Sequence, residues 1–135
     1  MKYILALIIS SAFISMSFSP IPASCKIFHK GVYKADYEDD YAVYLRFYKD
    51  GTVLHTTSVK DESQAFKYLS LDNKDNILSG KFSEGNCNIK GKVKGAAGKV
   101  NFYGTIEGET MFITMKNPAN GKTIEKTFEY YEMED

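Results

Sequence analysis

Apolar and polar residues alternate most clearly over residues 41–58, which read YAVYLRFYKDGTVLHTTS. Val43, Leu45 and Phe47 take every second position, and a period of two with aromatic and β-branched residues is typical of a half-buried strand. An Asp-Gly dipeptide then supplies the positive φ that a tight turn between two strands needs. The pattern predicts a β-hairpin with one apolar face, which must recruit further strands to be stable in water.

The rest of the chain supplies these strands, with one interruption. Residues 60–71 lose the alternation and place apolar residues three to four apart, which predicts a short helix. Short connections make successive strands antiparallel, and a meander of eight strands commonly closes into a barrel because closure removes its edges. We predict an all-β, eight-stranded antiparallel up-and-down barrel with one short helix between strands 3 and 4; the alternative is a two-sheet sandwich. The further strands are predicted over residues 31–37, 77–83, 87–93, 100–106, 110–116 and 122–131.

Residues 1–23 have the pattern of a secretory signal peptide. Lys2 precedes an uncharged run from Tyr3 to Phe18, and small residues and prolines follow up to Ala23. The uncharged run is shorter than the ~20 apolar residues of a membrane span, which argues against a retained anchor. We predict cleavage after Ala23, export to the periplasm or the extracellular space, and a single domain over residues 26–132.

The charges of the chain balance, with 17 basic and 17 acidic residues. Proteins that bind nucleic acid usually carry a basic excess, and Arg46 is the one arginine in the sequence. Nucleic acid is therefore not predicted as a partner. Ten tyrosines and nine phenylalanines, without any tryptophan, suit a β-rich core or a binding surface.

Cys25 and Cys87 leave three exclusive alternatives. In an oxidising compartment they could form a disulfide, which would close a loop of about sixty residues and stabilise the fold by roughly 4 kcal/mol. Alternatively, Ala23 and Ser24 before Cys25 fit a lipoprotein site, although Pro22 stands where a leucine-like residue is expected. A lipid on Cys25 would anchor the protein to a membrane. The third alternative is two unpaired thiols.

Gly31-Val32-Tyr33 opens the first strand, and the segments YLRFYKDGTV, SGKF, GTIEGETMFITM and TFEYYEM follow along the chain. Together these segments resemble the small bacterial exported barrels of the lipocalin-like, calycin type. Tyr33 stands where lipocalins have the tryptophan of their Gly-x-Trp motif, and their later Thr-Asp-Tyr segment and terminal arginine are absent. The resemblance covers nearly the whole exported part and implies a barrel, but a fold alone assigns no ligand.

The leading functional hypothesis is a non-enzymatic barrel that binds a small apolar molecule in its interior or mouth. No cofactor is expected, and the pattern predicts no oligomeric state. The residues expected to line the ligand are the inward-facing ones: Tyr33, Val43, Leu45, Phe47, Val53, Ile89, Phe102, Ile106, Met111, Ile113, Phe128 and Tyr130.

The alternative hypothesis is a solid-core barrel that binds a protein partner in the envelope or outside the cell. Tyr44, Arg46 and Tyr48 share the outer face of the hairpin, and tyrosine and arginine are enriched at interface hot spots. The same residues also suit an ordinary outer sheet face. The two hypotheses differ in whether the interior holds a cavity of ligand size. A hydrolase is the hypothesis with least support, because no nucleophile motif is present and no catalytic residue is predicted.

No metal site is predicted either. His29 and His55 lie in different segments, with no cysteine or carboxylate at ligand spacing. The acidic residues 38–40 lack the spacing of an EF-hand loop. We expect His55 to be an outward-facing or rim residue.

The two faces of the hairpin predict opposite responses to an added charge. Leu45→Asp should unfold the domain, since it places an unpaired charge on the buried face. Arg46→Asp, on the opposite face, should leave the fold nearly unchanged.

Overall fold

The computed structural model describes residues 25–134, and within them the fold is a closed antiparallel barrel of eight strands. A short helix, α2 (Glu62–Tyr68), and a 3-10 segment, η3 (Leu71–Asn76), lie between the third and fourth strands. The predicted fold class is therefore confirmed. The strands are β2 (Gly31–Glu38), β3 (Tyr41–Phe47), β4 (Thr52–Val59), β5 (Leu78–Gly85), β6 (Asn88–Gly95), β7 (Gly98–Glu107), β8 (Thr110–Lys116) and β9 (Thr123–Glu132).

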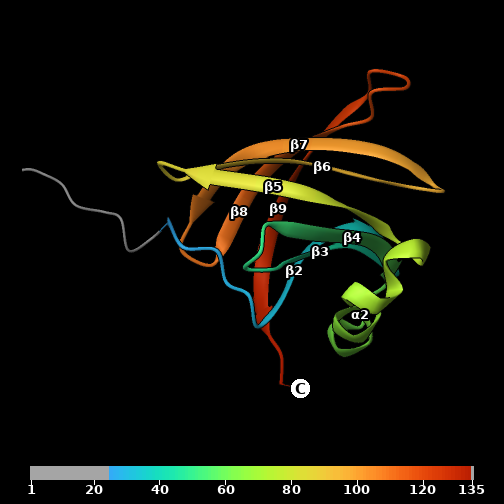
Figure 1. The fold of residues 1–135 in the computed structure, drawn as a ribbon, viewed down its shortest axis with the longest axis horizontal. Coiled ribbons are helices and arrows are strands. Elements are labelled where there is room, and N and C mark those ends of the chain that lie inside the picture. The colour runs from blue at the N-terminus through green and yellow to red at the C-terminus, as the bar shows by residue number, and fades with distance from the viewer. Residues whose placement is uncertain (1–24, 135) are drawn as a thin grey trace, which may run out of the picture.

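Each strand pairs with its neighbours in sequence, and β2 pairs with β9 to close the barrel. Figure 1 shows β5, β6 and β7 side by side on one side of the molecule, with α2 on the other side. The turn between β3 and β4 follows the predicted chemistry, because Gly51 has a φ of +94° and the carboxylate of Asp50 accepts a hydrogen bond from the Thr52 amide at 2.9 Å. No helix within residues 25–134 has the length and apolarity to cross a membrane.

The inward-facing side chains form one apolar core. Register places Leu45 beside Tyr33 on β2 and His55 on β4, and the alternation continues around the barrel. The ring of Phe102 lies across β6 where Gly91 has no side chain, so a Cβ at Gly91 would collide with that ring. All twelve residues predicted to line a ligand belong to this core or pack against it.

A second core cluster lies outside the barrel, between α2 and the outer faces of β2, β3 and β4. Asp61 caps the helix by accepting a hydrogen bond from the Gln64 amide at 3.0 Å. Phe66 and Leu69 bury their side chains against Tyr44, which is 0% exposed. The prediction that this face is exposed for a protein partner is therefore wrong, since the protein's own helix covers it.

Arg46 and Tyr48 hold the end of that helix. The Arg46 Nη1 donates to the carbonyl oxygens of Phe66 at 3.0 Å and Leu69 at 3.1 Å, and the Tyr48 hydroxyl donates to the Leu69 oxygen at 2.9 Å. The guanidinium carbon also lies 3.9 Å from the centre of the Phe66 ring. These carbonyls are among the last of the helix, which have no partner within it. The expectation that Arg46→Asp leaves the fold nearly unchanged is therefore also corrected.

Arg46→Gln should lower the free energy of unfolding by about 2 kcal/mol, because hydrogen bonds from a charged donor are worth more than neutral ones and the carbonyls beneath would lose them. Urea denaturation of the variant checks this value. Lys49→Gln, an exposed residue in the nearby turn, is the matched control and should change stability by less than about 0.5 kcal/mol. Equal stability of the two variants would contradict the role of Arg46.

Candidate functional site: the mouth of the barrel

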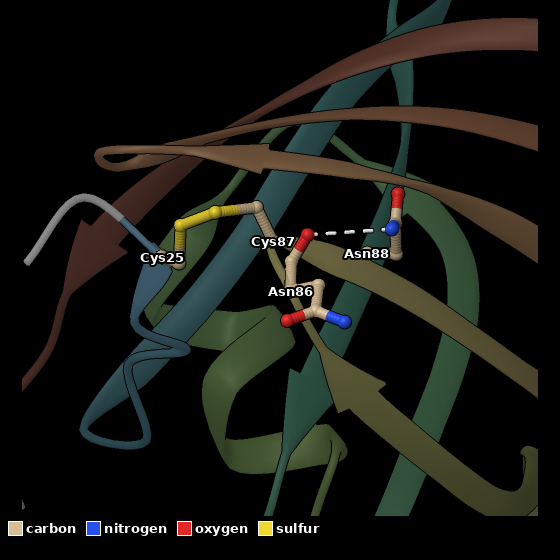
Figure 2. Close-up of a disulfide and its surroundings, with 4 residues drawn as sticks. All are labelled: Cys25, Asn86, Cys87 and Asn88. Carbon is tan, nitrogen blue, oxygen red and sulfur yellow. Dashed lines mark hydrogen bonds between the residues drawn. A yellow bond between two sulfur atoms is a disulfide. The ribbon is translucent and has the colours of Figure 1, made fainter. Parts of the chain in front are cut away.

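The two ends of the barrel differ. We call the end with the β3–β4, β5–β6 and β7–β8 turns the closed end, because residues 25–30 pass across it. Cys25 forms a disulfide with Cys87, which lies in the β5–β6 turn, and their Cα atoms are 4.8 Å apart (Figure 2). The predicted disulfide is thus confirmed, and with its sulfur bonded to Cys87, Cys25 has none left for a lipid. Such a bond is typical of proteins from oxidising compartments.

The turn that carries Cys87 has an uncommon backbone. Asn86 and Cys87 are the two central residues of the turn, and their φ values are +54° and +65°. A two-residue hairpin turn of type I′ requires a positive φ at both positions. The side-chain amide of Asn88 donates to the Asn86 carbonyl oxygen at 3.3 Å (Figure 2). A positive φ is sterically unfavourable for cysteine, because its Cβ comes close to the backbone. The turn nevertheless holds Cys87 opposite Cys25 in this conformation.

Aromatic side chains fill the barrel behind the disulfide. The Phe28 amide donates to the hydroxyl of Tyr33 at 2.9 Å, and the Phe28 ring stacks on Tyr130 with centroids 5.0 Å apart. Burial raises the pKa of Tyr33 to about 12, so its hydroxyl stays protonated at neutral pH. Tyr33 also contacts Phe47, whose ring meets Phe82 and Phe102 edge-on. This end of the interior is packed with the protein's own side chains.

The other end, which we call the mouth, is hollow. Its cavity measures about 370 Å³ and lies inside the ends of β2, β3, β4, β7, β8 and β9. Val43, Val100 and Met115 form apolar walls, while Lys116 and Lys122 contribute to its lining. The remaining lining residues are Tyr37, His55, Thr57, Asn117, Asn120 and Ile124.

Of the twelve residues predicted to line a ligand, Val43 borders this mouth cavity. The others fill the barrel, with Leu45, Phe47 and Val53 each 0% exposed. Tyr130 is partly buried and packs against the same core. The sequence thus identified inward-facing residues, but most of them occupy the interior rather than surround a space.

His55 stands at the floor of the mouth. It pairs with Leu45 on β3 and with Leu78 on β5, and the β4–β5 pairing ends at this residue. A second hollow of about 450 Å³, under η3 and the β6–β7 turn, also reaches His55 and Thr57. The side chain of His55 faces inward and only 9% of the residue is exposed, which corrects the expectation of an outward or rim position.

The electrostatics of His55 follow from this burial. Desolvation lowers the pKa of His55 from 6.5 to about 4, so the imidazole is neutral at pH 7. Its Nδ1 is buried and has no hydrogen-bond partner among residues 25–134. A buried polar atom left without a partner costs about 1–3 kcal/mol. A neutral imidazole offers one donor and one acceptor, so it can bind a hydroxyl or a carboxyl group placed in the mouth.

Against known proteins, the chain matches no family model, no curated protein and no solved structure. The geometry of the mouth therefore carries the functional argument. Over residues 25–134, no group of three or more His, Cys, Asp or Glu side chains is arranged to hold a metal ion.

The low pKa of His55 predicts a loss of stability in mild acid. Between pH 6.5 and pH 4 the unfolded chain takes up a proton on His55 that the folded protein does not, so the contribution is complete above pH 6.5 and falls with pH. The expected loss is about 3 kcal/mol by pH 4. Urea denaturation of wild type and His55→Gln at pH 7 and pH 4.5 measures it, since glutamine is polar but does not titrate.

The result that contradicts this assignment is equal acid sensitivity of the two proteins. Carboxylates that titrate in the same range are common to both, so the difference between the proteins isolates His55.

Most of the mouth could have been found from the strand pattern. Val100, Met115 and Ile124 occupy inward positions at the ends of predicted strands, and Thr57 shares a face with Val43 by register. The alternation does not show that these positions meet at the end of the barrel opposite residues 25–30, where no segment within residues 25–134 fills the interior. The position of residues 25–30 depends on the disulfide, which the sequence left as one of three alternatives.

Proposed function

We propose that this protein is an exported, non-enzymatic barrel that binds one small, mainly apolar molecule at its mouth. The observation that carries the proposal is the buried Nδ1 of His55, which has no partner within residues 25–134 and borders a cavity of about 370 Å³. Cavities of ~300–1,000 Å³ with apolar walls and a few convergent polar groups are typical of small-molecule sites.

The lining favours a molecule with an apolar body and an acidic head. Val43, Val100 and Met115 offer apolar contact area, which binds the body through burial. Lys116 and Lys122 attract an anionic head, and neutral His55 adds a hydrogen-bonding group that carries no charge of its own. The resemblance to lipocalin-like barrels supports a binding role for such a mouth.

The disulfide supports the proposed location. A bond between Cys25 and Cys87 persists in oxidising surroundings, which favours the periplasm or the extracellular space over the cytosol. The predicted signal peptide of residues 1–23 lies outside the described residues.

Decanoate serves as the probe for the proposed site. Isothermal titration should show one site for decanoate and weaker binding of decanol, which lacks the anionic head. Thr57→Trp fills the mouth and should weaken decanoate binding at least tenfold, which corresponds to about 1.4 kcal/mol. Thr127→Trp is the matched control, since Thr127 is an exposed residue on the outer face of β9, and it should bind decanoate as wild type does.

Equal binding by the two tryptophan variants would overturn the assignment to the mouth. Absence of any decanoate binding to wild type would overturn the proposed ligand class.

A further inference from the structure

Lysines gather on the outer face of β5, β6 and β7, although the whole chain is neutral. Register sets Lys81 directly opposite Lys92, and Lys94 directly opposite Lys99. Lys90 lies two residues along β6 from Lys92 and therefore on the same face. All of these lysines are exposed. The helix α2 packs against β2, β3 and β4, on the other side of the barrel (Figure 1).

The lysine face lacks compensating acids. Outward positions of β5, β6 and β7 from Ser79 to Ser83, Asn88 to Lys94 and Lys99 to Thr105 hold no carboxylate. Among the described residues, the ion pairs that form are those of Lys34 and Lys60, on the helix side. Like charges directly opposite each other destabilise a sheet. The fold thus carries a repulsion that an anionic partner would relieve.

The lysine face is also hollowed. One hollow of about 670 Å³ has lysines in its lining, namely Lys81, Lys90 and Lys92, but Phe82, Phe102 and Tyr103 make much of that lining apolar. A second hollow of about 380 Å³ continues along the same strands. The two share Ser83, Lys90 and Tyr103, so together they form one elongated depression, which we call the lysine furrow. Tyr103 is 57% exposed beside it. Glu84 lines the end of the second hollow.

We propose that the lysine furrow binds an anionic polysaccharide chain. The lysine ammonium groups would pair with its carboxylate or sulfate groups, and lysine suits such contacts because it acts as a mobile point charge. The exposed ring of Tyr103 offers an apolar face for one sugar ring. Ser83 and Asn101 supply neutral hydrogen-bonding groups that match sugar hydroxyls.

The same observations fit the other anionic macromolecules less well. Single-stranded nucleic acid is usually held by a series of aromatic platforms, whereas the furrow contains one exposed ring. An anionic membrane is bound by a surface that projects several apolar side chains into the lipid, whereas the outward side chains of this face are lysines, small polar residues and the one ring of Tyr103. A flexible chain of sugars can follow an elongated depression.

The test uses a heparin-derived hexasaccharide, with maltohexaose as the neutral chain of equal length. Isothermal titration of the full oxidised protein at 50 mM NaCl should show binding of the heparin hexasaccharide but not of maltohexaose. Binding should weaken at 150 mM NaCl, because salt screens the attraction between exposed charges. Lys90→Gln/Lys92→Gln should weaken it at least tenfold. Lys49→Gln/Lys67→Gln removes the same charge elsewhere and should change the affinity less than twofold.

Tyr103→Ala separates a shaped site from bare electrostatic attraction. It should weaken hexasaccharide binding about fivefold and leave the salt dependence unchanged, because no charge is removed. Tyr41→Ala, another exposed tyrosine on a strand, is its control and should bind as wild type does. Folding does not confound these results, since Lys90→Gln/Lys92→Gln relieves repulsion with Lys81 and should melt no lower than wild type.

Three outcomes overturn the proposal. The first is absence of hexasaccharide binding at 50 mM NaCl. The second is binding that Lys90→Gln/Lys92→Gln does not weaken relative to the Lys49→Gln/Lys67→Gln control. The third is equal or tighter binding, through the same lysines, of a twelve-nucleotide oligothymidine or of phosphatidylglycerol vesicles, which would assign the furrow to nucleic acid or to a membrane.

Discussion

Leu45→Asp should leave the protein largely unfolded at 25 °C. Leu45 is 0% exposed in the middle of the barrel, between Tyr33 on β2 and His55 on β4. A carboxylate at this position would lose its hydration without gaining a partner, at a cost of about 4–5 kcal/mol or more. That cost approaches the whole stability of many small domains, which is about 5–15 kcal/mol. Circular dichroism at 25 °C and during heating measures the effect.

Phe112→Asp is the control for this prediction. Phe112 is also an apolar strand residue, but it faces outward and is 45% exposed. Its replacement should retain the spectrum of the folded barrel. Two equally folded variants would mean that the assignment of the inward face is wrong, since a shift of one residue in register exchanges the two faces of a strand.

Removal of the disulfide should have the next largest effect. Cys25 and Cys87 are 62 residues apart in sequence, and the chain-entropy account of a loop that long gives about 4 kcal/mol. Cys25→Ser/Cys87→Ser should therefore lower the free energy of unfolding in urea by about that amount. The wild type should have an intact mass two hydrogens below that of the reduced chain, and reductant should lower its melting temperature.

An unchanged melting temperature on reduction would contradict the structural role of the disulfide. A lipid mass on Cys25 would contradict the disulfide itself. A peptide that links Cys25 to Cys87 in a non-reduced digest is the expected result.

The order and type of the strands could be predicted because most strands alternate apolar with polar residues and short turns join them. The predicted strand 31–37 is β2 (Gly31–Glu38), and the predicted strand 110–116 is β8 (Thr110–Lys116). The β5–β6 turn differs from the prediction: the alternation predicts a strand from Cys87 onward, yet Cys87 has a positive φ and lies in the turn. Cysteine is not a typical turn residue, so its local sequence gave no signal.

The outer face of the hairpin could not be assigned from local pattern. Tyr44 and Tyr48 each combine an apolar ring with a polar hydroxyl group. Such side chains occur on exposed and on buried sheet faces, so the residue type does not decide between the two. The structure buries Tyr44 under Phe66 and Leu69, whose spacing of three residues is typical of a helix. Alternation shows which residues share a face, but the element that covers that face is decided by tertiary packing.

His55 and the lysine furrow escaped prediction for related reasons. Val53 and Leu54 are both apolar, so the alternation that would place His55 inward is interrupted just before it. The lysines are spread over residues 81–99 in a chain of zero net charge, and they become one face only when β5, β6 and β7 pair. The net charge of a sequence does not show whether the fold gathers charges of one sign on one face.

The most direct test of the mouth as the binding site is to map a bound probe residue by residue. Amide chemical shifts of the ¹⁵N-labelled protein, followed during a titration with decanoate, provide this map. Binding at the mouth predicts the largest changes at Val43, His55, Thr57 and Met115, with little change at Phe28 or Lys90. Changes centred on the closed end or on the lysine furrow, with the mouth unaffected, would contradict it.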